Sequence, residues 1–297
     1  MRIQLVLFVI LWLPQATGCA SLGRRGPPPA EVAAAREMSM QGMAAVEGGQ
    51  WDRAESLLRK SLETSPSDAD SRRYLAEALW RRGATDQALT QIVAAAQLDG
   101  GDASLAVRAG EMLLAAGSAE LALAQANQAI QLDSRLAAAW ALRGRTYWHL
   151  HQPDRALADL HHALECQPNN RDVLLDVAGI YRQLGQPTRC LTTLHHLLDT
   201  YSPGEEPQQV LLMEGLALND LGRGRQAADS LWAACRRGPP SAEILCLLAQ
   251  VQTSIGEYDT AAASAQQALA LDATHAASRA LLAELAGRTT AIEPHRR

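Results

Sequence analysis

The chain has almost no phenylalanine, almost no lysine and no excess of basic residues. Phe8 is the only phenylalanine and Lys60 the only lysine among 297 residues, so a core must be built largely from alanine, leucine and valine. Basic residues number 27 against 32 acidic residues. A chain with a net charge of −5 has no surplus of cations to neutralise phosphates, so nucleic acid is not expected as a partner. A hydrophobic content of 47% excludes a disordered chain.

Long hydrophobic runs are also missing, apart from a short one at the start. The unbroken apolar run from Leu5 to Leu13 is too short for a membrane-spanning helix, which needs about 20 residues. Arg2 precedes this run, and small residues follow it at positions 16–18. This pattern is typical of a secretory signal peptide, so residues 1–18 are predicted to be one.

The residue after the signal peptide is a cysteine. Ala16-Thr17-Gly18-Cys19 resembles a bacterial lipobox, which implies that Cys19 carries the lipid and becomes the mature N-terminus. Residues 19–34 are then a lipid-anchored, proline-rich tether. The resemblance to enterobacterial lipoproteins implies that Ala20 and Ser21, which stand where no acidic residue follows the cysteine, favour the outer membrane of a bacterial envelope, facing the periplasm. Two alternatives remain open: an ordinary signal peptide cut nearby, and an uncleaved anchor.

The body of the chain repeats every 34 residues. Gly49, Gly83, Gly117 and Gly185 lie at multiples of 34, and the spacing resumes at Gly222 after a three-residue slip. Within each repeat, apolar and small residues recur at the spacing of one helix face, first before and then after a break. One such helical hairpin cannot bury its apolar face alone, so neighbouring hairpins are expected to stack into a continuous core.

The fourth repeat carries a family motif almost completely, in Trp140, Gly144, Tyr147, Ala156, Leu160, Ala163 and Pro168. This pattern resembles the tetratricopeptide repeat (TPR) family. The resemblance implies an all-α fold, a right-handed superhelical solenoid of seven helix-turn-helix repeats with a C-terminal capping helix. The predicted repeats are residues 35–68, 69–102, 103–136, 137–170, 171–204, 208–241 and 242–275, followed by a capping helix at 276–287 and a loose tail at 288–297.

The resemblance also implies that the first helix of each repeat lines a concave groove that binds a protein or peptide. Trp80 and Trp148 lie two whole repeats apart, so they are expected on the same wall of this groove. Tryptophan and arginine are enriched among the few interface residues that contribute most of the binding energy between proteins. An alternative role for both tryptophans is packing between adjacent first helices. The candidate partner-binding residues are Arg73, Glu77, Trp80, Arg81, Arg145, Trp148, His149 and Arg182.

Cysteines and histidines suggest little further chemistry. Cys235 and Cys246 lie about equally far from the turn at Gly238, so a disulfide between them is possible in an oxidising envelope, with small buried residues as the alternative. The pairs 161–162 and 195–196 are histidines in equivalent places, but each pair can offer only one metal ligand because successive helical residues diverge by about 100°. No metal or cofactor is expected.

No catalytic motif is present in the sequence, so an enzyme and a small-molecule substrate are not expected. The sequence therefore predicts a lipid-anchored scaffold or adaptor of the bacterial cell envelope. Its groove would bind a partner protein or peptide, in the assembly of a pilus, secretion or other envelope complex. The alternative is a structural envelope protein that associates with itself.

Overall fold

The structure is a computed structural model that describes residues 30–239 and 241–292. These residues form fifteen α-helices and no β-strand. The first eight are α1 (Ala30–Glu47), α2 (Trp51–Thr64), α3 (Ala69–Arg81), α4 (Thr85–Leu98), α5 (Ala103–Ala115), α6 (Ala119–Leu132), α7 (Ala137–His149) and α8 (Pro153–Cys166). The others are α9 (Arg171–Gln183), α10 (Pro187–Leu198), α11 (Gln208–Asp220), α12 (Gly224–Arg237), α13 (Ala242–Ser254), α14 (Tyr258–Leu271) and α15 (Ala276–Ile292).

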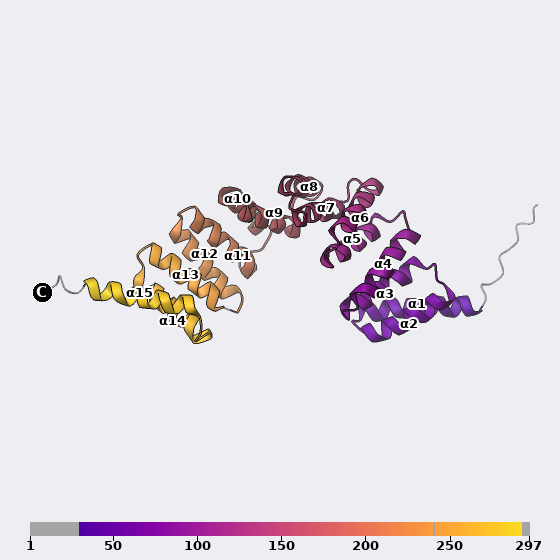
Figure 1. Cartoon of the computed structure of the whole chain (residues 1–297), viewed down its shortest axis with the longest axis horizontal. Helices are drawn as coiled ribbons and strands as arrows, with labels where there is room; N and C mark the ends of the chain where they lie inside the picture. Colours follow the sequence, from indigo (N-terminus) through magenta and orange to yellow (C-terminus); the bar gives the residue numbers. More distant parts are fainter. Residues whose placement is uncertain (1–29, 240, 293–297) are drawn as a thin grey trace, which may run out of the picture.

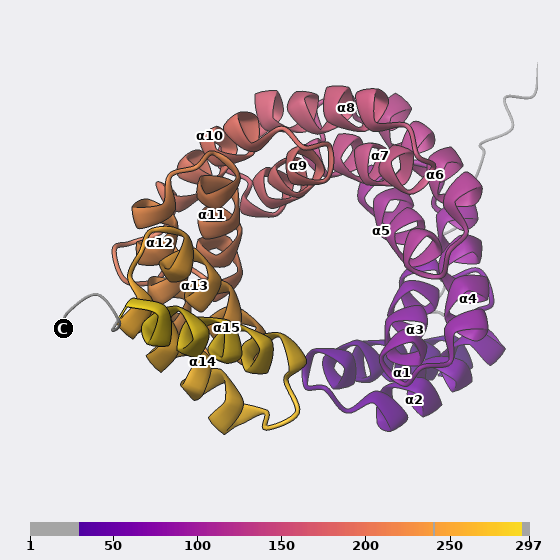
Figure 2. The same ribbon diagram turned by 60° about the vertical axis from the view of Figure 1, so that its left-hand side comes forward.

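Consecutive helices pair into seven hairpins that stack side by side, with α15 packed against the last of them (Figure 1). The odd-numbered helices α3 to α13 surround a central space, and the even-numbered helices lie outside them (Figure 2). Inner helices of neighbouring repeats also pack directly on one another, as α5 does on α7. The predicted all-helical TPR solenoid of seven hairpins and a capping helix is therefore confirmed.

Small residues allow the two helices of a hairpin to approach closely. A Cβ atom added at Gly144 on α7 would lie 2.8 Å from Cγ of Leu160 and 3.0 Å from the carbonyl oxygen of Ala156, both on α8. The equivalent Gly42 and Gly215 face leucines of α2 and α12 in the same way. At these three crossings a larger residue would displace the leucine, which explains why small residues recur at this position.

The turn inside each hairpin needs a left-handed backbone. Glycines with φ between 64° and 84° occupy this turn in six of the seven hairpins, at Gly49, Gly83, Gly117, Gly185, Gly222 and Gly256. In the fourth hairpin His151 takes the same conformation, with φ of 57°. A side chain in this region costs about 1–2 kcal/mol, so the fourth hairpin carries local strain that the other turns avoid.

Two predicted boundaries differ from the helices observed. Helix α1 begins at Ala30, so residues 30–34, assigned above to the tether, are helical. Helix α15 continues to Ile292, past the predicted end of the capping helix at residue 287. The predicted signal peptide and Cys19 lie outside the described residues. Within the part that the structure describes, no helix combines the length and the hydrophobicity needed to span a membrane.

Candidate functional site

Three hollows along the inner wall are each lined by a residue at one repeating position. This position lies one residue before the C-terminal end of each first helix. It holds Val46, Trp80, Leu114 and Trp148 in the first four repeats. The hollows are named here after the residues Val46, Trp80 and Trp148 that line them, and their volumes are about 290, 460 and 310 Å³. Odd-numbered helices supply almost all of the walls of these hollows, and the same helices surround the central space (Figure 2).

The Trp80 hollow combines an apolar floor with a charged rim. Met112 and Leu142, from α5 and α7, are buried and form part of the floor. Arg108, Arg145 and exposed His149 lie around them. Such a mixture of apolar area and a few polar groups is typical of sites that bind polypeptide side chains.

The Trp148 hollow lies further along the same wall, between α7, α9 and α11. Leu175 and Met213 supply apolar area, and Asp176 and Arg182 supply charge. Arg145 lines this hollow as well as the Trp80 hollow, so it lies between the two. The two hollows therefore form one continuous stretch of surface.

Ion pairs connect successive inner helices. Arg108 on α5 donates to Glu77 on α3 over 2.6 Å and to Glu111 on its own helix over 3.1 Å. Arg81 also donates to Glu77, over 3.0 Å. Burial raises the pKa of Glu77, but the hydrogen bonds and charges of Arg108 and Arg81 outweigh burial and hold this pKa below its ordinary value.

A second pair connects α7 with α9. Nε of Arg145 lies 2.5 Å from a carboxylate oxygen of Asp176. Burial raises the pKa of Asp176 above its ordinary value, the charge of Asp172 adds to this effect, and Arg145 offsets it only in part. The two pairs thus occur at corresponding places, but the net pKa shifts of their carboxyl groups are opposite because burial outweighs the arginine only at Asp176.

Both tryptophans pack against the core and line a hollow at the same time. Trp80 is half-buried and packs against core residues of the second and third repeats, and Trp148 packs against the large core that extends from α7 to α13. Each ring also forms part of its hollow. The packing role is therefore observed for both tryptophans, and the partner-binding role stays a prediction.

The structure brings most of the predicted groove residues to the wall, but not all. Arg73 and Glu77 line the Val46 hollow. Arg81 lines none of the three hollows, and its guanidinium lies 5.8 Å from the ring centroid of Trp51 on α2. Sequence analysis missed Arg108 and Asp176, which are both 31 residues after an oppositely charged partner on the preceding inner helix. This spacing is the signal that would have found them.

The cysteine pair is not joined in the structure. Cys235 and Cys246 are both free thiols, so the disulfide considered above is absent from the described residues. Cys246 is buried within α13, whereas Cys235 is half-buried on α12. Burial raises the pKa of the Cys235 thiol, so a smaller fraction of this group is in the reactive thiolate form.

The histidine pairs make separate contacts rather than a metal site. Nε2 of His161 lies 2.9 Å from the hydroxyl of Tyr181, and the His162 ring meets the Trp140 ring edge-on with centroids 4.0 Å apart. His195 contacts Glu214, and His196 contacts Asn169. The described residues include no group of three or more potential ligands placed to hold a metal ion.

The stacked helical hairpins and the repeating inner wall are those of a tetratricopeptide-repeat solenoid fold. The family model of the tetratricopeptide repeat matches residues 39–104 and 212–276. No curated protein matches the sequence.

Solved structures show the same fold at low sequence identity. A tetratricopeptide repeat protein from Parabacteroides merdae is 17% identical, with a TM-score of 0.61 over 85% of this chain and 98% of its own. The type IV pilus biogenesis factor PilW is 17% identical, with a TM-score of 0.65 over 72% of this chain and 98% of its own. YrrB, described as having an unusual peptide-binding site, is 20% identical, with a TM-score of 0.55 over 63% of this chain and 95% of its own.

Proposed function

We propose that the protein is a lipid-anchored adaptor of the bacterial cell envelope that holds a segment of a partner protein on its inner wall. The observation that carries the proposal is the row of three hollows, two of which place a half-buried tryptophan beside arginines. These residue types dominate binding energy at interfaces because they pair a large apolar area with hydrogen-bond donors. The wall is broad and open, which suits a polypeptide better than a small molecule.

The proposed anchor rests on the N-terminal sequence. The lipobox-like residues 16–19 follow a short apolar run, and several acyl chains on Cys19 would hold the protein at a membrane because each buried CH₂ contributes about 0.8 kcal/mol. The proposed location is the periplasmic face of the outer membrane. PilW is a pilus biogenesis factor, and a pilus is one envelope complex whose assembly this adaptor could serve.

Site-directed photocrosslinking in the native envelope tests the adaptor. A photoreactive amino acid replaces His149, which is exposed at the Trp80 hollow, and in a matched control it replaces Leu121, which is 58% exposed on α6. We expect a discrete crosslinked partner from position 149 and not from position 121. The same products from both positions, or none from position 149, would contradict a partner bound at the inner wall.

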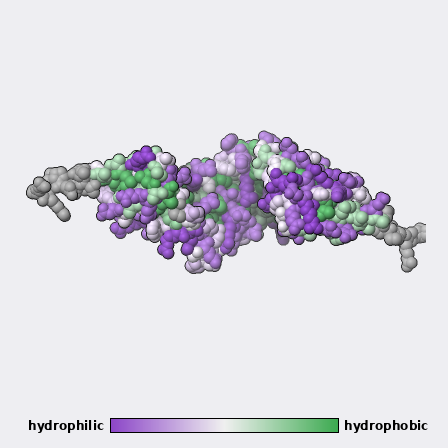
Figure 3. Space-filling model, turned by 90° about the horizontal axis from the view of Figure 1, so that it is seen from below, coloured by the Kyte–Doolittle hydropathy of each residue, from purple (hydrophilic) through white to green (hydrophobic). Residues whose placement is uncertain are grey.

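Self-association is the second candidate function, and a separate apolar patch favours it. Trp232 on α12 and Leu271 on α14 are 50% and 55% exposed and line one hollow of about 350 Å³ with Cys235 and Leu245. Seen from below, the surface is largely hydrophilic, with smaller hydrophobic areas near the middle and towards both ends (Figure 3). Light scattering of the protein in detergent distinguishes the candidates: a dimer that Trp232→Glu dissociates would favour self-association, and a monomer would favour the adaptor.

A further inference from the structure

The Trp80 and Trp148 hollows are built from equivalent positions, two repeats apart. Each begins at the tryptophan of one inner helix and continues over the next two inner helices. The correspondence joins Trp80 with Trp148, Met112 with Ile180, and Leu142 with Met213. In the repeat between them, the tryptophan position holds Leu114. The wall therefore presents the same aromatic-edged hollow twice.

The charges of the two hollows are also similar. The Trp80 hollow contains Arg108, Arg145 and one carboxylate, that of Glu111. The Trp148 hollow contains Arg145, Arg182 and one carboxylate, that of Asp176. Arg145 is shared, so the two hollows together hold three arginines and two carboxylates, a net charge of +1 with neutral histidine, although the whole chain carries −5. A ligand with carboxylates beside its apolar groups complements this distribution.

A glycine widens the Trp148 hollow. Gly179 stands in the middle of α9 at the position that Glu111 occupies in the Trp80 hollow, and no atom lies within 4 Å of a Cβ built on it. The glycines at the hairpin crossings behave differently: a Cβ at Gly110 would lie 2.4 Å from a methyl group of Leu142. Packing therefore does not require Gly179, and its effect is to leave room for a bulky side chain beside Trp148.

We propose that the two hollows bind one extended, acidic segment of a partner polypeptide through two bulky apolar side chains, one in each hollow. This inference rests on the proposed function and specifies its ligand. Neighbouring helices pack about 10 Å apart, so two repeats separate the hollows by about 20 Å. An extended chain rises about 3.3 Å per residue, so the two apolar residues are about six positions apart. Carboxylates between them meet Arg145.

Selection from a random peptide library provides the first test. A phage library of dodecapeptides is selected on the immobilised full-length protein in detergent. We expect enriched peptides to carry two bulky apolar residues about six positions apart with acidic residues between them. Enrichment of peptides with a single apolar residue, with no preferred spacing, or with basic residues would overturn the proposal, as would no enrichment at all.

Fluorescence anisotropy with the most enriched peptide provides the second test. Replacing either apolar residue of the peptide by alanine, or either Trp80 or Trp148 by alanine, is expected to weaken binding about thirtyfold. The matched control is Trp232→Ala on the outer helix α12, which leaves binding unchanged. If a peptide with one apolar residue replaced by alanine binds as tightly as the original peptide, only one hollow is used and the proposal is overturned.

A blocking variant covers the case in which a tryptophan variant fails to fold. Gly179→Leu adds a side chain where the structure has open space, so it fills the Trp148 hollow without displacing the core. We expect an unchanged circular dichroism spectrum. Binding should fall to the affinity that the wild-type protein has for the peptide with only one of its two apolar residues. If photocrosslinking from position 149 finds a partner but Gly179→Leu retains full peptide affinity, the two-hollow inference fails while the adaptor function stands.

Discussion

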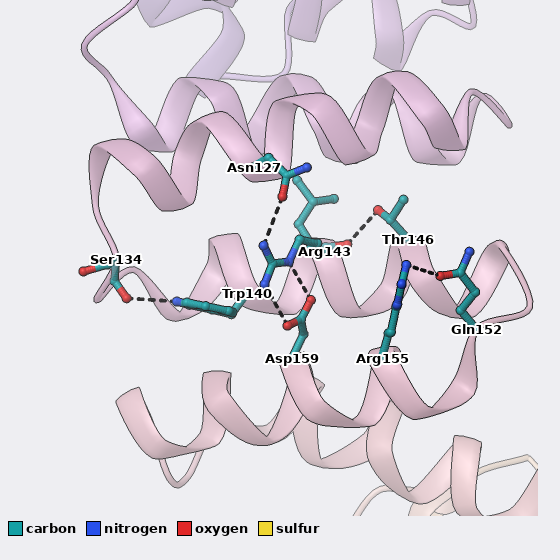
Figure 4. A network of polar contacts seen from close by, with 9 residues as sticks. Asn127, Ser134, Trp140, Arg143, Thr146, Gln152, Arg155 and Asp159 are labelled. Atoms are coloured by element: carbon teal, nitrogen blue, oxygen red, sulfur yellow. Dashed lines mark hydrogen bonds and ion pairs between the residues drawn. The ribbon is translucent and has the colours of Figure 1, made fainter.

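The guanidinium of Arg143 on α7 donates to both carboxylate oxygens of Asp159 on α8, over 2.6 and 2.9 Å (Figure 4). A third hydrogen bond, of 3.0 Å, reaches Asn127 on α6, and the guanidinium lies 4.6 Å from the centroid of the Trp140 ring. Asp159 is 7% exposed. The pair therefore joins the two helices of the fourth repeat, and the hydrogen bond to Asn127 connects it to the third.

Arg143→Ala is expected to lower the free energy of unfolding by about 3 kcal/mol, because it leaves Asp159 buried without its partner. Thermal denaturation followed by circular dichroism measures the effect. The double variant Arg143→Leu with Asp159→Leu is expected to recover most of the loss, because it leaves no buried charge. Equal melting temperatures for wild type and Arg143→Ala would show that the pair contributes nothing.

Glu77 and Asp176 are expected to give opposite pH dependences. The pKa of Glu77 lies below 4.5 in the folded protein, so its contribution is present above that pH and is lost as the pH falls through the lower folded value. Glu77→Gln should therefore lower stability at neutral pH by about 0.5–1 kcal/mol, a difference that disappears in acid. Denaturant titrations at a series of pH values measure this difference.

The folded pKa of Asp176 is raised, so its ionised form disfavours folding and stability rises as the pH falls through that value. Asp176→Asn is consequently expected not to reduce stability at neutral pH and to remove this rise in acid. A loss of stability at neutral pH as large as that of Glu77→Gln would contradict the assignment, since it would mean that Arg145 outweighs burial.

The turn of the fourth hairpin offers a stabilising substitution. His151 has φ of 57° in a position where the other hairpins have glycine. His151→Gly is expected to raise the free energy of unfolding by about 1 kcal/mol, because it removes the left-handed strain. Gly117→Ala, with φ of 81° in the third hairpin, is the matched opposite and should destabilise by a similar amount. A lower melting temperature for His151→Gly would mean that the histidine side chain holds the turn.

Two glycines on inner helices should respond oppositely to alanine. Gly179→Ala is expected to stabilise the protein by about 1 kcal/mol, because alanine favours the helix and the added Cβ meets open space. Gly144→Ala should destabilise it, since its Cβ would lie 2.8 Å from the side chain of buried Leu160. Urea denaturation of both variants provides the measurement, and a loss of stability in Gly179→Ala would show that this glycine has a packing role.

The anchor gives a prediction that does not depend on the groove. Cys19→Ala is expected to abolish incorporation of a palmitate analogue during growth, because the thiol that accepts the lipid is gone. Cys166→Ala, which replaces an exposed cysteine at the end of α8, is the matched control and should be labelled like wild type. Labelling of Cys19→Ala at the wild-type level would exclude lipidation at this position.

The sequence by itself determined the period, the hairpins and their number. These features follow from local rules: apolar residues recur along one helix face, small residues mark the crossings, and left-handed turns favour glycine. Each repeat contacts mainly its neighbours, so a repeating sequence is enough to specify the stack. The inward positions of Trp80 and Trp148 followed from the same register, through the resemblance to the family.

Only the tertiary structure decided which inward residues share a hollow. Arg108 and Asp176 complete ion pairs across successive helices, and Arg145 reaches both tryptophan hollows, because the stacking places residues of different repeats within a few ångströms. The same stacking allows Arg81 to lie beside Trp51 instead of in a hollow. Helical periodicity gives the direction of a side chain from its helix, but the position of the neighbouring helix decides what that side chain contacts.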